Sequence, residues 1–62
     1  MSQVTITATM TEAEAYAFAQ FLKRVGFSDY ASNAESQQEA YIMIDAGEAI
    51  RSALAKQGFA PR

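Results

Sequence analysis

Paired carboxylates are the side chains of this chain whose types and spacing come nearest to acid–base chemistry. Glu35 and Glu39 are four residues apart. Asp45 and Glu48 are three apart. Each pair would share one face of a helix, but catalytic carboxyl groups also need a cleft that shifts their pKa, and no motif for one surrounds these residues. We therefore expect them to form a solvated helix surface.

Cysteine and histidine are both absent from the 62 residues. Their absence removes the usual nucleophile–base pairs, and the serines have no general base beside them in a recognisable motif. Only carboxylates remain as metal ligands, which disfavours structural zinc. The glycines are isolated from one another, so they form no phosphate-binding loop. We expect a non-enzymatic protein with no catalytic residue, no cofactor and no metal site.

Length and charge narrow the class of protein further. A single domain of 62 residues usually needs disulfides, a metal or oligomerisation, and only oligomerisation remains here. The formal net charge of −2 makes nucleic acid a less expected partner. No apolar run approaches the ~20 residues of a membrane span, and no basic region precedes an apolar stretch at the N-terminus. We expect a cytoplasmic protein with no membrane contact.

Residues 3–10 alternate between apolar and polar side chains, a pattern typical of a half-buried β-strand. The apolar side holds Val4, Ile6, Ala8 and Met10. A lone strand leaves its backbone polar groups unpaired. The segment 25–30 is the one candidate for a second strand in the chain, and its Gly, Ser and Asp residues weaken it.

Two helices are predicted after this strand. Thr11 and Glu14 have the spacing of a capping box, which starts a helix over residues 12–25, and Gly26 has the position of a left-handed helix stop. Residues 26–35 are predicted to form a loop. Capping-box spacing then occurs at both Ser32 and Ser36, of which Ser36 is the preferred start of a helix over residues 36–57. Gly58 ends that helix, and a short C-terminal tail follows.

The second predicted helix carries an apolar band about 160–180° wide, broader than one neighbouring helix covers. Gly47 lies within the band, where close approach by another helix would offset its cost of about 0.8–1 kcal/mol relative to Ala. We therefore expect an α+β, mostly helical protein with β-α-α order and two antiparallel helices, completed by homodimerisation. The expected dimer interface comprises Val4, Ile6, Ala46, Gly47, Ile50, Ala53 and Leu54. The expected core comprises Phe18, Leu22, Ile42, Ile50 and Leu54.

Exposed tyrosines and carboxylates are the candidate contacts for another protein. Tyrosine is enriched at binding hot spots, and acidic side chains steer association with a basic surface. The expected partner-binding residues are Tyr16, Asp29, Tyr30, Glu35, Glu39, Tyr41, Asp45 and Glu48.

The order of strand and two helices in a chain expected to dimerise resembles the ribbon-helix-helix family. The residues that carry the resemblance are Val4-Thr5-Ile6-Thr7-Ala8-Thr9, then Phe18, Leu22 and Gly26. The resemblance implies that strands of two chains pair antiparallel and that Thr5, Thr7 and Thr9 contact bases in the DNA major groove. This chain differs from the family in its longer link between the helices, in having no Arg, Lys or Asn on the outward strand face, and in its acidity.

Two functions are open at this point. The first is a small acidic protein-binding module, an inhibitor or regulator of a larger partner with a basic surface. Inhibitors from phages and mobile elements, including anti-CRISPR proteins, are often this small and acidic. The alternative is a ribbon-helix-helix-like DNA-binding repressor or antitoxin.

Overall fold

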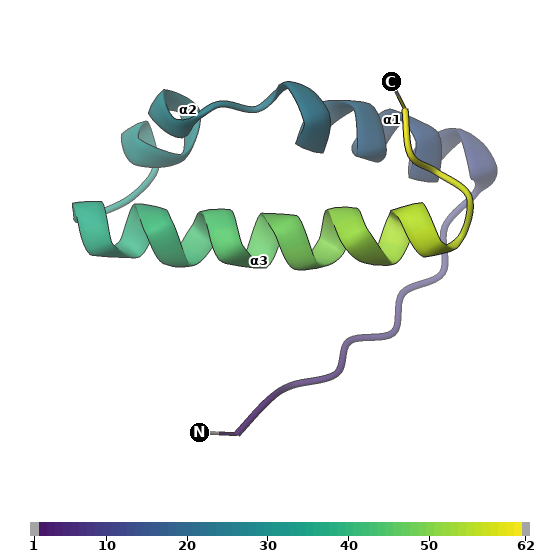
Figure 1. Ribbon diagram of the computed structural model, residues 1–62, viewed down its shortest axis with the longest axis horizontal. Helices are drawn as coiled ribbons and strands as arrows, with labels where there is room; N and C mark the ends of the chain where they lie inside the picture. Colours follow the sequence, from purple (N-terminus) through teal and green to yellow (C-terminus); the bar gives the residue numbers. More distant parts are fainter. Residues whose placement is uncertain (1, 62) are drawn as a thin grey trace.

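A computed structural model describes residues 2–61, and within them it contains three helices and no strand. They are α1 (Glu12–Arg24), α2 (Phe27–Ser32) and α3 (Gln37–Lys56). The long α3 forms one layer, and α1 and α2 lie end to end along it as the other layer (Figure 1). Both shorter helices contact α3 but not each other. The described part of the chain is therefore all-helical, and the predicted α+β fold with β-α-α order is wrong.

The segment 2–10, predicted as a strand, is extended and has no assigned secondary structure. From the start of α1 it passes the C-terminal end of α3, where residues 6–10 border a concavity with Ala53, Leu54 and Phe59, and only its first residues diverge from the helices (Figure 1). Val4 and Ile6 are 83% and 73% exposed. Apolar and polar residues alternate along the segment, but a strand also needs a hydrogen-bonded neighbour, so the predicted strand is wrong. The other candidate segment, 25–30, cannot supply that neighbour because most of it belongs to α2.

The start of α1 is the capping box that the sequence predicts. Thr11 Oγ1 accepts a hydrogen bond from the Glu14 amide at 3.1 Å, and Glu14 Oε1 accepts one from the Thr11 amide at 2.8 Å. The helix ends at Arg24, one residue before the predicted end. Gly26 is not a left-handed stop, because its φ is −108°. Its amide instead donates to Asp29 Oδ2 at 2.9 Å, which starts a new helix.

That new helix, α2, occupies much of the predicted loop over residues 26–35. The amides of Asp29 and Tyr30 both donate to the Gly26 carbonyl, at 3.1 and 3.3 Å. The turn residues of this segment, which favour a loop in isolation, therefore act as helix caps. The Phe27 ring packs 5.5 Å from the Tyr41 ring of α3, centroid to centroid. This tertiary contact favours the helical conformation of α2 in addition to its own hydrogen bonds.

Both ends of α3 follow the sequence signals closely. Ser36 is the N-cap, with its Oγ accepting from the Glu39 amide at 3.1 Å, so the preferred start is confirmed and the earlier one at Ser32 is wrong. The helix ends at Lys56, and Gly58 has a φ of +98°. The Phe59 amide then donates to the Leu54 carbonyl at 3.0 Å. This reversal returns Phe59 to the core.

The core is small and consists mostly of alanine. Its buried residues are Ala15, Ala19, Leu22, Ala40 and Leu54, with Phe59 packed against the cluster of α1 and α3 residues. Burial of Leu22 and Leu54 is confirmed. Burial of Phe18, Ile42 and Ile50 is wrong, because they are 42%, 60% and 38% exposed. Alanines at the contact let α1 and α3 approach closely, so the larger side chains beside them remain outside.

Gly47 is covered by this chain's own Tyr30, not by a second helix. A Cβ added at Gly47 would overlap the Tyr30 hydroxyl oxygen and lie 3.2 Å from the ring's Cζ. Tyr30 is partly buried in this position. Leu54 also lies inside the protomer. Gly47 and Leu54 therefore take part in packing inside the protomer, and their place in a dimer interface stays a prediction.

None of the helices in residues 2–61 has the length and hydropathy needed to span a membrane.

Replacing Leu54 with Ala should lower the free energy of unfolding by about 2–5 kcal/mol, because it removes a leucine from the α1–α3 contact. Val4→Ala is the matched control, since Val4 is 83% exposed, and it should change stability by no more than about 0.5 kcal/mol. Urea denaturation followed by circular dichroism measures both. Equal effects of the two substitutions would show that Leu54 is not part of the core.

The effect of Gly47→Ala on the free energy of unfolding should depend on whether Tyr30 is present. In a Tyr30→Ala chain the added methyl group meets open space, and higher helix propensity should stabilise the protein by about 0.8–1 kcal/mol. In the wild-type chain the Tyr30 ring must shift, so the same change should be less favourable by about 1 kcal/mol or more. The four variants of this cycle give the coupling from their unfolding free energies. A coupling near zero would mean that Tyr30 does not cover Gly47.

Candidate protein-interaction surface

The three predicted tyrosine anchors lie in different surroundings. Tyr16 is 52% exposed, and its hydroxyl accepts a hydrogen bond from Gln20 Nε2 at 2.8 Å. Tyr41 is equally exposed but packs against Phe27. Tyr30 is partly buried over Gly47. The structure therefore leaves Tyr16 and Tyr41 available at the surface, on different helices, and does not gather the tyrosines into one site.

Several predicted partner-binding carboxylates already have local hydrogen bonds. Asp29 Oδ2 accepts from the Gly26 amide, and Glu39 Oε1 accepts from the Glu35 amide at 2.8 Å. Glu48 Oε2 lies 3.7 Å from Arg51 Nη1, on an exposed face of α3. Asp45 and Glu35 are exposed. These carboxylates are spread over α2, the turn before α3 and α3 itself, so they form no single cluster.

A different set of residues forms a continuous hollow along α1. Two adjoining concavities share Ala17 and Phe21. The first extends toward α2 and α3 and is also lined by Val25, Tyr30 and Met43. The second extends toward the start of α1 and is also lined by Met10 and Phe18. We call the two together the α1 groove.

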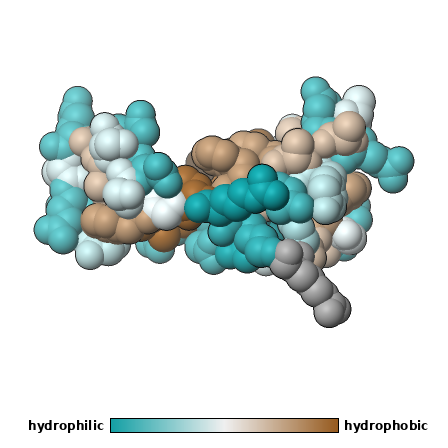
Figure 2. All heavy atoms as spheres, turned by 90° about the horizontal axis from the view of Figure 1, so that it is seen from above, coloured by the Kyte–Doolittle hydropathy of each residue, from teal (hydrophilic) through white to brown (hydrophobic). Residues whose placement is uncertain are grey.

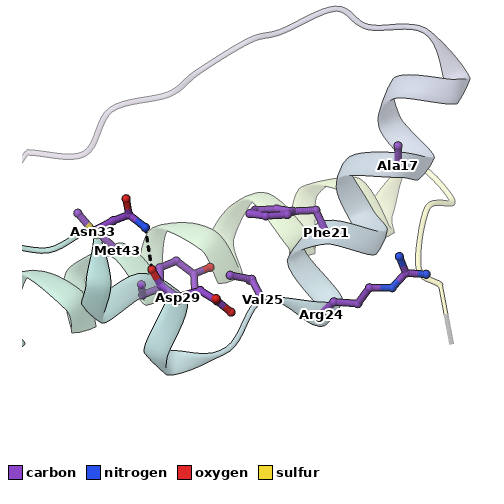
Figure 3. A pocket seen from close by; sticks show the side chains of 8 residues that line it. Ala17, Phe21, Arg24, Val25, Asp29, Asn33 and Met43 are labelled. Atoms are coloured by element: carbon purple, nitrogen blue, oxygen red, sulfur yellow. Dashed lines mark hydrogen bonds between the residues drawn. The ribbon is translucent and has the colours of Figure 1, made fainter.

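The geometry of the α1 groove is visible in close-up. The Phe21 ring and the Val25 side chain extend toward α2, whereas Arg24 extends the other way (Figure 3). On the α2 side, Asn33 Nδ2 donates to the Asp29 carbonyl at 2.9 Å, which holds the end of that short helix. At this end the α1 groove therefore runs between α1 and α2, with an apolar lining from Phe21, Val25 and Met43.

Aromatic side chains make this face more apolar than an ordinary protein surface. The Phe18 and Phe21 rings stack with centroids 5.6 Å apart, and they are 42% and 53% exposed. In the view onto α1 and α2, apolar atoms lie beside a strongly hydrophilic strip that crosses the middle of the face, and further hydrophilic atoms lie toward both ends (Figure 2). These exposed aromatic rings make the face a candidate for contact with another molecule.

Charged side chains border the α1 groove at its ends. Glu14 lines it near the start of α1, and Asp29 lines it on α2. Arg24 borders the middle. An apolar segment with positive charges near its ends matches this arrangement better than one with negative ends.

Sequence reasoning missed the aromatic and aliphatic lining of the groove. Helical spacing places Phe18, Phe21 and Val25 on the same apolar stripe as Leu22, and that spacing alone predicts burial for all of them. The length of the chain could have indicated that some of these side chains stay exposed. One helix pair in so short a chain cannot enclose three large side chains on a single helix.

The predicted dimer-interface residues that remain at the surface fall into two groups. Val4 and Ile6 are exposed on the extended N-terminal segment. Ala46, Ile50 and Ala53 are exposed on α3. Within the single chain, Gly47 is instead covered by Tyr30 and Leu54 is buried.

Comparison with known proteins gives a family and no further relatives. No curated protein and no solved structure matches the chain. One family model, described as a family of unknown function (DUF7706), matches residues 1–62. The match covers the full length of the sequence, so the chain belongs to the family DUF7706.

Proposed function

We propose that this chain is a small acidic, non-enzymatic protein-binding module that inhibits or regulates a larger protein. The α1 groove is the observation that carries the proposal, because it exposes two phenylalanines that a protein with no binding partner would do better to bury. Aromatic side chains in a hollow supply large contact area with few rotatable bonds, which is the character of binding hot spots.

The occupant of the groove is an apolar segment of the partner, most simply one face of an amphipathic helix. The 13 residues of α1 span about 20 Å, which exceeds the roughly 10 Å over which a helix presents side chains at i, i+4 and i+7. Glu14 and Asp29 at the two ends favour Lys or Arg flanking that segment.

The acidic surface outside the groove suits a partner with a basic face. Glu35, Asp45 and Glu48 are exposed, and the net charge is −2. Such charges mainly raise the rate of association. By size and charge the chain fits the inhibitors that phages and mobile elements direct against host defences, of which anti-CRISPR proteins are one kind.

DNA binding is not carried forward as a second candidate function. That alternative depended on a strand presenting Thr5, Thr7 and Thr9 to the major groove. These threonines lie on an extended segment that belongs to no sheet within residues 2–61.

Phe21→Ala should weaken partner binding by about 2 kcal/mol or more, chiefly through faster dissociation, because Phe21 belongs to both halves of the α1 groove. Tyr16→Ala is the matched control: Tyr16 is an aromatic residue of the same helix, exposed to the same degree, and does not line the groove. Wild type and both variants, immobilised in equal amounts, would be tested in native-host lysate. Proteins retained by wild type would be identified by mass spectrometry, and their dissociation rates measured.

The Phe21→Ala variant must first show the helical circular dichroism spectrum of wild type. Loss of capture by Phe21→Ala but not by Tyr16→Ala supports the groove as the binding site. Equal capture by all three proteins, or loss with Tyr16→Ala alone, would place the binding site elsewhere and overturn this proposal.

A further inference from the structure

The single chain exposes much more surface than a folded protein of its size. Its accessible surface is 5219 Å² at a mass of 6.8 kDa, whereas a compact monomer of that mass exposes about 3,950 Å². Its radius of gyration is 12.6 Å, against about 10.6 Å for a compact chain of this length. The extended segment 2–10, all of which is exposed, supplies part of this excess of about 1,270 Å². The excess as a whole compares with the ~800 Å² that each partner contributes to a standard stable interface.

A continuous part of this excess surface lies on α3. Five residues that are all exposed recur at helical spacing and share one face, which we call the α3 stripe: Ile42, Ala46, Ala49, Ile50 and Ala53. Ile42 is 60% exposed. On a helical wheel the stripe is centred about a third of a turn from the face that Ala40, Gly47 and Leu54 turn toward α1 and α2. Neither short helix covers it.

The spacing within the α3 stripe is that of a helix-pairing seam. Ile42, Ala46, Ala49 and Ala53 are separated by four, three and four residues. A four–three alternation keeps a seam facing a partner helix along its length. Alanines at three of the four positions leave room for a second helix to approach, and alanine is likewise the residue buried where α1 meets α3, at Ala15 and Ala19.

The charge distribution along α3 points to a second copy in the antiparallel direction. Its acidic residues occupy the first two thirds of the helix: Glu39, Asp45 and Glu48. Its basic residues, Arg51 and Lys56, follow them toward the C-terminus. Antiparallel pairing brings the acidic part of each copy to the basic part of the other and opposes the two helix dipoles. Parallel pairing would align like charges instead.

We propose that a second copy of this chain covers the α3 stripe, with the two α3 helices antiparallel about a twofold axis. Such an interface uses the same patch on both copies. The register that sets Ala46 of one copy against Ala49 of the other also sets Ile42 against Ala53 and brings Glu39 level with Lys56. The stripe shares no residue with the α1 groove. Dimerisation and the proposed partner binding can therefore be tested independently of each other.

Sedimentation equilibrium of the purified full chain from low to high micromolar concentration tests the dimer. Wild type should sediment as a dimer, and Ala49→Glu should raise the dissociation constant at least about 100-fold, because it buries a charge in the seam. The matched control is Ala55→Glu, the same change at an exposed residue on the opposite side of α3, which should leave dimerisation unchanged. Circular dichroism of the dilute variants checks that the helices persist.

Disulfide trapping tests the same face and its direction without an added charge, because the chain has no cysteine of its own. Ile42→Cys and Ala53→Cys variants, mixed and oxidised, should form the mixed disulfide in excess over either homodimer. A monomeric wild type would overturn the proposal, as would dominant 42–42 and 53–53 disulfides. A dimer that survives Ala49→Glu but is lost when Val4 and Ile6 are both replaced by Ser would also overturn it and assign the contact to the N-terminal segment.

Discussion

The close contact between α1 and α3 is the interaction on which the rest of the structure depends. Ala15 and Ala19 bring the two helices together, and Leu22, Leu54 and Phe59 fill the space beside them. Because the contact is made by small side chains, it buries little area. The chain exposes 5219 Å² of the about 9,900 Å² expected for its unfolded form, so it buries about 47% where a domain of this length usually buries about 60%.

This shallow core explains why apolar side chains collect on two surfaces. The α1 groove and the α3 stripe hold the phenylalanine and isoleucine side chains that the helix contact cannot enclose. In a larger domain both would lie beneath another element. Here each is available for a separate purpose, one hollow and aromatic, the other flat and rich in alanine. The hollow is the reason for assigning a foreign segment to the first, whereas the residue spacing and the order of charges along α3 assign a second copy to the second.

The sequence predicted local features well and the distribution of burial poorly. Helix starts at Thr11 and Ser36 and the stop at Gly58 are set by hydrogen bonds within a few residues, so a short pattern contains all the necessary information. Whether Phe18 or Ile42 is buried depends on how closely distant helices approach. Helical periodicity shows which residues share a face, but not whether the chain has an element to cover it. The strand prediction for residues 3–10 is wrong for the same reason, because a strand forms only where a second segment pairs with it.

A core of alanines also changes the kind of substitution to which the protein is sensitive. Ala19 and Ala40 have no exposed surface, and truncation can remove only one methyl group from each. Cavity formation is therefore a minor hazard there, whereas a single added methylene pushes two helices apart. At these two positions the protein should therefore tolerate smaller side chains better than larger ones. Serine or glycine can replace these alanines at modest cost, while valine or leucine would separate the layers and with them the walls of the α1 groove.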